Sequence, residues 1–525
     1  LSRNLPLPLC KNCSTPHSAS VTEPPMPTDE PGAIQCSSRG STSAALSTHT
    51  ASMLFFRSAA AGVFLDIAPF AHIMKSIDFI PFCAFARRAA LLRRRTPFCG
   101  QASAFPPRQG AGNEVCIVAS PSILPVLIGA DMNCYSVARA FHEAYGVESY
   151  AFGRWPMGDT MYSKIVHCTY IENVDEPAVL ARTVTDFANA HAEKTCVVLG
   201  CTDDYASLLM EIKETLPKNC VAPYIGPALR DRLVSKADFY ELCDEYSIPY
   251  PKTVCVAGAK DAGALSPQAL GFAYPIIVKP SSSILYWKHP FGGMKKVYTA
   301  HTPEEAAAIL AQIYGAGYPD KVILQDMIPG DDSFMHVLTA YVDKNHAVKM
   351  MCLGHVGLEE HTPRALGNHA AIITEYNAPL MEKLKAFLEA IEYTGFANFD
   401  IKYDTRDGSY RVFEINLRQG RSNYYVTGAG YNIARYVVED RVLGRELGPC
   451  VMNRKEAFWH SVPRAVVYRY VKDKAFVEKA RRLAKEGKET TSFGYAKDLA
   501  LNPRRFAYYL VHMQRYFKKF KTYCR

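Results

Sequence analysis

The sequence predicts a protein of the α/β and α+β classes, in which a domain with a parallel sheet precedes a domain that contains an antiparallel hairpin. In the region after residue 115, short apolar runs that end in glycine are followed by segments with the spacing or the capping residues of a helix. Further along, two runs of alternating apolar and polar residues flank Asp407-Gly408, a strong signal for a hairpin turn. Strand-then-helix units favour a parallel sheet flanked by helices.

The first domain is expected at residues 116–230. The run LPVLIGADM contains Gly129 at the end of its apolar part, and a helical pattern follows it. The run TCVVLG repeats this scheme, because it ends at Gly200 and is followed by Asp203 or Asp204 as the expected helix cap.

The second domain is expected at residues 231–450. Ser235 is the expected N-cap of a helix that ends before SIPYP, because proline cannot continue it. The apolar strand YPIIVKP carries Lys279, and the Ser/Gly-rich basic loop SSSILYWKHPFGGMKK follows it. The run KVILQDMIPGDD is typical of a strand that enters a turn. An amphipathic helix is predicted over MEKLKAFLEAIEYTG, with Gly395 as its C-cap glycine.

The bulk composition is that of a globular protein, with 525 residues, 48% hydrophobic and 21% charged. The formal net charge of +9 fits an anionic substrate or a weak attraction to a membrane surface. Without a basic-aromatic patch on a recognised fold it does not indicate nucleic acid, so no nucleic-acid partner is expected. Cys10 and Cys13 form a CxxC without a second pair at zinc spacing, so the cysteines are expected to be reduced thiols of a cytosolic protein.

The two ends of the chain differ from its middle. Residues 1–115 are rich in Ser, Thr, Pro and Ala, and charged residues interrupt their apolar patch before it reaches the length of a membrane helix. We interpret them as a disordered leader or as sequence joined spuriously to the protein. Residues 451–525 are expected to form a basic, helical C-terminal extension. Its last helix either docks on the protein or makes a peripheral contact with an anionic membrane surface.

The hairpin around Asp407-Gly408 is the most informative part of the sequence. For apolar residues to face apolar residues, the pairing must centre on residue 407, which places Asp400 directly opposite Glu414 and Asn398 opposite Asn416. Arg418 continues the same polar face.

Two carboxylates that face each other across a sheet repel, so a cation between them is expected. Magnesium prefers oxygen ligands, takes few protein carboxylates and completes its octahedron with water and phosphate oxygens. The hairpin therefore predicts a magnesium–phosphate platform made of Asp400, Glu414 and Asn416, with Arg418 placed to neutralise an anion. The alternative is a solvent-facing strand whose charges pair loosely.

These motifs occur in the order found in the ATP-grasp superfamily, which the region resembles. The resemblance implies an ATP-grasp fold, in which ATP lies between two α+β subdomains, preceded by a Rossmann-like pre-ATP-grasp domain. It also implies an enzyme, an ATP-dependent carboxylate–amine ligase, that activates a carboxylate as an acyl phosphate for attack by an amine.

The resemblance also assigns roles to residues. The implied ligands of magnesium, which is expected as a pair of ions, are Asp400, Glu414 and Asn416. The implied catalytic residues are Arg418 and Lys279. The implied ATP-binding residues are Lys236, Lys279, Ser281, Ser282, Ser283, Gln325, Asp326, Met327, Ile328 and Asp332. Gln325 departs from the glutamate that many members direct toward the adenine amino group, although its amide oxygen can still accept that hydrogen bond.

Within the superfamily, the motifs PVLIGADMNCYSVARAFHEAYG, EYTGFANFDIKYD and FEINLRQGRSNYYVT resemble those of the D-aspartate ligases of Gram-positive bacteria. This resemblance implies that ATP phosphorylates the side-chain carboxylate of D-aspartate. The lysine ε-amine of a peptidoglycan precursor stem peptide then attacks, in the cytoplasm or at the inner face of the membrane. D-Aspartate needs further cations, for which His355, His361, Arg364 and Arg421 are candidates, and His369 is a candidate base for the amine.

Several alternatives stay open at this point. The chain could be another ATP-grasp carboxylate–amine ligase with a different amino acid or acceptor, since no spacing rule reads the substrate pocket. It could also be a non-catalytic nucleotide-binding or membrane-associated scaffold, although such a protein is expected to lack some of the lysines or metal ligands. The oligomeric state and the choice between a soluble and a lipid-linked acceptor are not determined by the sequence.

Overall fold

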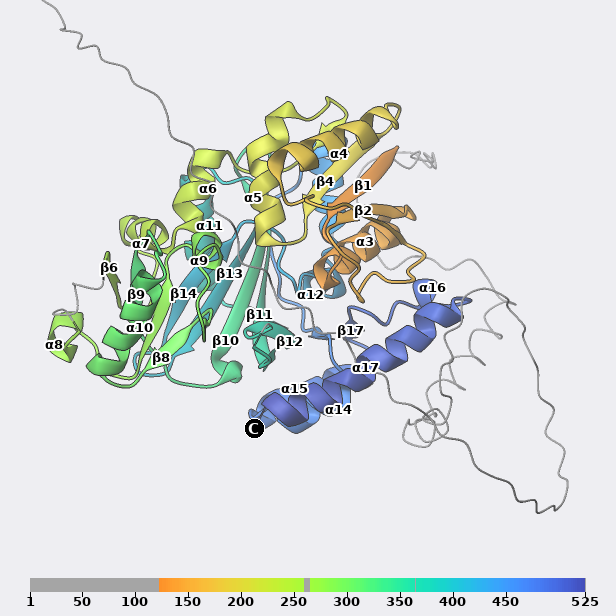
Figure 1. Ribbon diagram of the computed structural model, residues 1–525. Coiled ribbons are helices and arrows are strands. Elements are labelled where there is room, and N and C mark those ends of the chain that lie inside the picture. Colours follow the sequence, from red (N-terminus) through yellow and green to blue (C-terminus); the bar gives the residue numbers. More distant parts are fainter. Residues whose placement is uncertain (1–121, 259–264, 364, 525) are drawn as a thin grey trace, which may run out of the picture. The chain divides into compact units, whose positions relative to one another are not determined.

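The computed structural model describes residues 122–258, 265–363 and 365–524 (Figure 1). The predicted leader, residues 1–115, lies outside the described residues, and so does the candidate substrate residue Arg364. Within the described residues the strands form three sheets.

The first sheet is parallel and has the strand order β3-β2-β1-β4-β5. Its strands are β1 (Ile123–Ile128), β2 (Ser149–Gly153), β3 (Val166–Tyr170), β4 (Thr195–Gly200) and β5 (Cys220–Val221). The helices of this region are α3 (Met132–Tyr145), α4 (Pro177–Asn189), α5 (Asp203–Ile212) and α6 (Pro227–Val234). Both predicted strand-then-helix units are confirmed, as β1–α3 and β4–α5.

The predicted cap of α5 is wrong. The N-cap is Thr202, whose hydroxyl accepts a hydrogen bond from the backbone nitrogen of Tyr205 at 3.3 Å. Asp203 and Asp204 lie in the first turn, where negative charge is favourable at a helix N-terminus. The side chain of Asp203 is therefore free to make a contact elsewhere.

The second sheet is antiparallel and has the order β6-β9-β7-β8. Its strands are β6 (Thr253–Val256), β7 (Ile276–Pro280), β8 (Tyr298–Ala300) and β9 (Val322–Asp326). It is accompanied by α7 (Lys236–Glu245), α8 (Pro267–Leu270), α9 (Ser283–Trp287) and α10 (Pro303–Gly315). Ser235 caps α7 as predicted. The segment predicted as a continuous loop instead begins with α9, because the Ser282 hydroxyl caps this helix.

The third sheet has the order β14-β13-β10-β11-β12-β16-β17, with β15 paired to β11. Its strands are β10 (Met335–Val342), β11 (Val348–Glu360), β12 (Asn368–Glu375), β13 (Gly395–Asp404), β14 (Ser409–Asn416), β15 (Val451–Met452), β16 (Phe458–His460) and β17 (Glu489–Thr491). The last three strands belong to the segment after residue 450, so the extension predicted as helical also completes this sheet.

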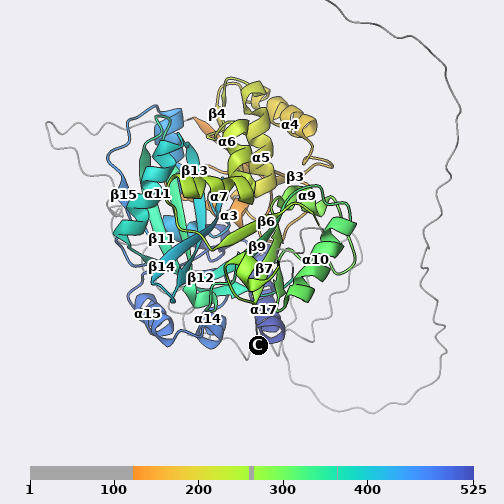
Figure 2. The ribbon, with the colours of Figure 1, turned by 90° about the vertical axis from the view of Figure 1, so that its left-hand side faces the viewer.

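The helices of the third region are α11 (Ala378–Ala390), α12 (Tyr424–Gly428), α13 (Ile433–Val437), α14 (Arg464–Tyr470), α15 (Lys474–Lys485), α16 (Ala496–Leu499) and α17 (Pro503–Tyr523). In Figures 1 and 2, α17 lies beside α14, and Tyr516 and Phe520 of α17 are buried in the core. The last helix is therefore docked on the protein. No helix among the described residues is long and apolar enough to cross a membrane.

Gly395 has a different role from the predicted one. Helix α11 has its C-cap at Ile391, and Gly395 is the first residue of β13. Its φ of +91° is unfavourable for residues with a side chain, and a Cβ built here would lie 2.0 Å from the carbonyl oxygen of Pro223. Glycine therefore lets the start of β13 approach the first domain closely.

We predict that Gly395→Ala lowers the free energy of unfolding by about 2 kcal/mol or more, because the new methyl group adds a steric clash to an unfavourable backbone conformation. Chemical denaturation would measure this loss. Gly448→Ala is the matched control, since a Cβ there meets nothing within 4 Å. Equal stability of the two variants would contradict the prediction.

Candidate active site

The β13–β14 hairpin brings the predicted metal-binding side chains together. Asp400 lies directly opposite Glu414, and Asn398 lies opposite Asn416, as predicted from the alternation of polar and apolar residues. Nearer the turn the register shifts, so that Ile401 faces Val412. Phe413 is the extra residue of this bulge, and it lines the pocket instead of the predicted apolar face.

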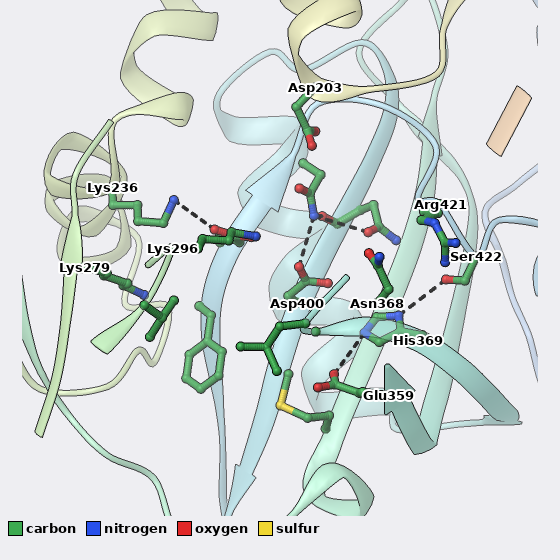
Figure 3. A pocket seen from close by; sticks show the side chains of 18 of the residues that line it. Asp203, Lys236, Lys279, Lys296, Glu359, Asn368, His369, Asp400, Arg421 and Ser422 are labelled. Carbon is green, nitrogen blue, oxygen red and sulfur yellow. Dashed lines mark hydrogen bonds and ion pairs between the residues drawn. The ribbon is translucent and has the colours of Figure 1, made fainter. Parts of the chain in front are cut away.

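The polar face of this hairpin forms one wall of a cavity of about 370 Å³ (Figure 3). The cavity is lined by side chains from all three sheet regions. They include Asp203, Lys236, Lys279, Lys296, Glu359, Asn368, His369, Asn398, Asp400, Phe413, Glu414, Asn416, Arg418, Arg421 and Ser422. In Figure 3 the three lysines lie on one side, Arg421, Ser422, His369 and Glu359 lie on the other, and Asp400 lies between them.

The lysine side of the cavity carries several positive charges and few carboxylates that pair with them. Lys236 Nζ lies 2.9 Å from Glu414 Oε2, and this ammonium holds the pKa of Glu414 well below its ordinary value. Lys279 Nζ lies over the ring of Phe413 and donates a hydrogen bond to the Tyr240 hydroxyl at 3.4 Å. Burial, together with the charge of Lys236, lowers the pKa of Lys279 to about 7. An anion bound here would restore the positive charge on Lys279.

At Asp400 the negative charge of the carboxylate is disfavoured. Desolvation and the charge of the facing Glu414 raise its pKa to about 7, while a hydrogen bond from Asn416 Nδ2 at 3.2 Å lowers it. The oxygens of Asp400, Glu414 and Asn416 are the hard ligands that suit Mg²⁺. In the structure, the ammonium of Lys236 provides the positive charge beside Glu414. The residues at this position therefore fit a divalent cation.

Arg418 joins the hairpin to the first domain. It lies two residues after the end of β14, and its guanidinium Nη2 donates to Asp203 Oδ2 at 2.7 Å. Nη1 donates to the carbonyl oxygen of Gln419 at 3.1 Å, whereas the buried Nε has no hydrogen-bond partner in the structure. Arg418 is thus held in the cavity by a carboxylate that a bound anion could replace.

The far side of the cavity is built from β11, β12 and the loop after β14. His369 Nδ1 lies 3.4 Å from the hydroxyl of Ser422, and its Nε2 lies 3.7 Å from Glu359 Oε1. Burial, followed by the charge of Arg421, lowers the pKa of His369 to about 4. Burial raises the pKa of Glu359 to about 8. This side therefore combines a neutral imidazole with a carboxyl group that lacks a cationic partner at hydrogen-bond distance.

A comparison with curated proteins decides the family. A D-aspartate ligase from Enterococcus faecium (strain Aus0004) is 41% identical to this chain over 413 residues, which cover 77% of this chain and 98% of that protein. This chain belongs to the D-aspartate ligase family. The predicted ATP-grasp fold class and the prediction of an ATP-dependent ligase are thereby confirmed.

More distant relatives are similar to this chain over a smaller share of its length. The carbamoyl phosphate synthase large chain from Hyperthermus butylicus is 24% identical over 224 residues, which cover 41% of this chain and 19% of that protein. An N5-carboxyaminoimidazole synthetase structure from Staphylococcus aureus is 16% identical, with a TM-score of 0.46 over 65% of this chain and 82% of that chain. Likeness at this level carries no argument about the site. No protein-family model matches the chain.

The ligase holds the predicted adenine-binding residues on and after β9. The side-chain nitrogen of Gln325 donates to the Tyr240 hydroxyl at 2.9 Å and to Thr253 Oγ1 at 2.8 Å. These two bonds use both donors of the amide nitrogen and leave the amide oxygen as an acceptor, and its contact with adenine stays a prediction. Met327 is 40% exposed, and the carbonyl oxygen of Ile328 accepts a hydrogen bond from Lys402 Nζ at 3.0 Å.

Other predicted ATP-binding side chains of the ligase contact the protein instead of the cavity. Asp326 forms an ion pair with Arg406 at 2.6 Å and lines a separate cavity. Asp332 lies 2.8 Å from His361 Nε2, and the Ser281 hydroxyl accepts a hydrogen bond from the backbone nitrogen of Ala237 at 3.2 Å. Ser282 caps α9, whose first residue is Ser283. The ATP contacts of these residues stay predictions.

Two predicted substrate residues lie outside the cavity. His355 Nδ1 is 3.3 Å from Glu375, and its Nε2 lies 2.6 Å from the carbonyl oxygen of Ser333. His361 is held by Asp332. Both imidazoles thus face acids of the protein and do not line this cavity, and their role toward the substrate stays a prediction. The structure does bring His369 and Arg421 to the cavity.

Sequence reasoning assigned no site role to several residues that line the cavity, among them Asp203, Lys296, Glu359 and Asn368. Lys296 ends the basic loop that the sequence marked, and Asp203 was considered only as a cap. Glu359 lies in a polar segment in which only histidines and arginines were considered. The register of β11 against β12 shifts on both sides of Leu358, and the sequence gives no signal for these shifts.

We predict that Asp400→Asn stabilises the ligand-free ligase at high pH. The raised pKa means that ionising Asp400 costs folding free energy, so the wild-type protein loses stability as the pH rises from about 4 to about 7. The variant lacks this loss. Its advantage should be on the order of 1 to 3 kcal/mol above pH 7 and should vanish near pH 4, since one pKa unit corresponds to about 1.4 kcal/mol.

Thermal unfolding in the presence of a metal chelator and without nucleotide would measure this difference. The control is Asp407→Asn, because the Ser409 hydroxyl lowers the pKa of this turn carboxyl and no gain is expected there. A variant that is less stable than the wild type at high pH would refute the argument.

Proposed function

We propose that this chain is an ATP-dependent D-aspartate ligase. It activates the side-chain carboxylate of D-aspartate as an acyl phosphate and joins it to the lysine ε-amine of a peptidoglycan precursor stem peptide. The observation that carries this proposal is the pair of facing carboxylates Asp400 and Glu414, beside three lysines, in a member of the D-aspartate ligase family.

The three lysines would bind the triphosphate. Lys279 is partly discharged near neutral pH, so it gains its full charge as phosphate oxygens approach. Lys236 would exchange its contact with Glu414 for a phosphate, which frees the Glu414 carboxylate for a metal ion. Magnesium held by Asp400, Glu414 and Asn416, as the predicted pair of ions, would neutralise phosphate charge during transfer.

Arg418 would stabilise the oxyanion that forms when the amine attacks the acyl phosphate. Its present partner, Asp203, is 57% exposed on the side chain and can move into water when the guanidinium turns to the anion. Loss of such a donor typically costs about 2.7–4 kcal/mol of barrier. The amine nitrogen bonds to the acyl carbon and gives up a proton, for which His369 is the candidate base, while the bond from that carbon to the phosphate oxygen breaks and phosphate leaves. Through its contact with the guanidinium, Asp203 would hold Arg418 in place until the substrate binds.

The experiment that tests this proposal measures ADP release with D-aspartate, L-aspartate and D-glutamate, with the acceptor stem peptide present. We expect ADP release to depend on D-aspartate and on the acceptor. Stimulation by a different amino acid, with none by D-aspartate, would favour another carboxylate–amine ligase and sink the proposal.

The same assay tests the site through Glu414→Gln. We expect kcat to fall about 100-fold or more, because the variant loses one of the two facing carboxylates. Glu456→Gln is the control, since this glutamate pairs with Lys479 and Arg482 at the surface. Full activity of Glu414→Gln would refute the metal assignment.

We also propose that α17 contacts an anionic membrane surface at the cytoplasmic side, where a lipid-linked acceptor would lie. The helix exposes Phe517 and Tyr523 by 40% and 49%, next to the exposed Lys518 and Lys521. Aromatic and basic side chains together favour an interfacial position.

Cosedimentation with vesicles rich in anionic phospholipid would check this. The double variant Phe517→Ser/Lys521→Ser should bind several-fold more weakly than the wild type, because it loses an apolar and a basic contact. Lys485→Ser, on the exposed face of α15, should bind as the wild type does. Absence of vesicle binding by the wild type would leave a soluble nucleotide-linked acceptor as the better substrate.

A further inference from the structure

The far side of the cavity ends in two opposite charges, Glu359 and Arg421, and each has one buried polar atom without a hydrogen-bond partner. Glu359 Oε1 and Arg421 Nη1 are both buried and unpaired in the structure. Their side chains are 13% and 26% exposed. Buried polar atoms without a partner are uncommon, because each one loses its bonds to water and gains nothing in return. The two side chains therefore suit a ligand that carries both a positively and a negatively charged group.

Arg421 contacts the Tyr516 hydroxyl and lies in the field of Glu360, Asp159 and Asp131, but no carboxylate of the described residues lies at hydrogen-bond distance from it. Its Nη2 lies 3.6 Å from Glu360 Oε1, which is longer than a hydrogen bond, and Glu360 also lies 3.5 Å from Lys519 Nζ of α17. Glu360 is thus shared between two cations. The guanidinium keeps donors available for a carboxylate, which it could bind through two parallel hydrogen bonds.

Glu359 is available for a cation in the same way. It lies on β11 directly opposite His369 on β12, and the nearest cationic candidate is the imidazole of His369 at 3.7 Å. The low pKa of His369 leaves this imidazole neutral near pH 7, so it does not neutralise Glu359. Burial disfavours the ionised form of the Glu359 carboxyl group. An ammonium group bound beside Glu359 would stabilise that ionised form.

We propose that Glu359 and Arg421 form a zwitterion subsite, in which Glu359 binds the α-ammonium and Arg421 the α-carboxylate of the amino-acid substrate. This inference rests on the proposed function and deepens it. Held in this way, the substrate points its side-chain carboxylate toward Asp400, which lies between this subsite and the lysines in Figure 3. The subsite thereby determines which of the two carboxylates of aspartate is activated, because the α-carboxylate is held away from the lysine side.

The test combines variants of the protein with truncated substrates. Succinate is aspartate without the α-ammonium, and 3-aminopropanoate is aspartate without the α-carboxylate. For the wild type, kcat/KM in the ADP-release assay with acceptor should be about 30- to 100-fold lower for either analogue than for D-aspartate, as expected for the loss of a charged hydrogen bond.

In Glu359→Gln, kcat/KM for D-aspartate should fall by a similar factor, while the value for succinate should stay within about threefold of the wild type. Arg421→Met should behave in the same way with 3-aminopropanoate. The KM for ATP should not change in either variant, and this readout, with Glu456→Gln as the control, shows that the fold is intact. Glu359→Asp, which keeps the charge, should recover part of the loss.

Two results would overturn the inference. One is a Glu359→Gln enzyme that keeps the wild-type preference for D-aspartate over succinate. Another is a variant whose KM rises for the acceptor and not for D-aspartate, which would assign Glu359 to the acceptor amine. A wild-type enzyme that releases no ADP with D-aspartate would instead refute the proposed function, so the two failures are distinguishable.

Discussion

The repulsion between Asp400 and Glu414 is the constraint on which the rest of the site depends. The two carboxylates face each other across the hairpin, and the protein offsets their repulsion by placing Lys236 beside Glu414 and by leaving Asp400 easy to protonate. Such a pair destabilises a sheet unless a cation lies nearby. The hairpin is therefore built for a ligand that brings positive charge, and the nearby lysines suit the negative charge that accompanies it.

The first domain shapes the loop that follows this hairpin. Asn133, at the start of α3, accepts a hydrogen bond from Asn423 Nδ2 at 2.8 Å and donates to the carbonyl oxygen of Cys201 at 2.7 Å. Gln419 Nε2 donates to the carbonyl oxygen of Gly200 at 3.1 Å. These bonds are buried, so the loop that carries Arg418 and Arg421 is fixed by the parallel sheet. The first domain thus positions both arginines of the cavity.

The sequence predicts one wall of the cavity better than the other. A strand has a period of two, so alternation alone determined that Asp400 faces Glu414. Alternation failed at Phe413, because a bulge adds one residue that no pattern announces. The sequence makes no prediction of a strand at Glu359, which register shifts in β11 bring opposite His369. The roles of the lysines and of Gln325 came from the resemblance to a family, since spacing cannot tell a phosphate-binding lysine from one that points to solvent.

The contact between Lys519 and Glu360 gives the end of the chain an influence on the substrate pocket. Glu360 lies between Lys519 and Arg421 and is almost fully buried, so it divides its charge between the two cations. If α17 were removed, Glu360 would lose its contact with Lys519, and Arg421 would lose its contact with the Tyr516 hydroxyl. The last helix thus acts on the pocket in two ways, because Lys519 shares Glu360 with Arg421 and the Tyr516 hydroxyl contacts Arg421 itself, although none of its own side chains lines the cavity.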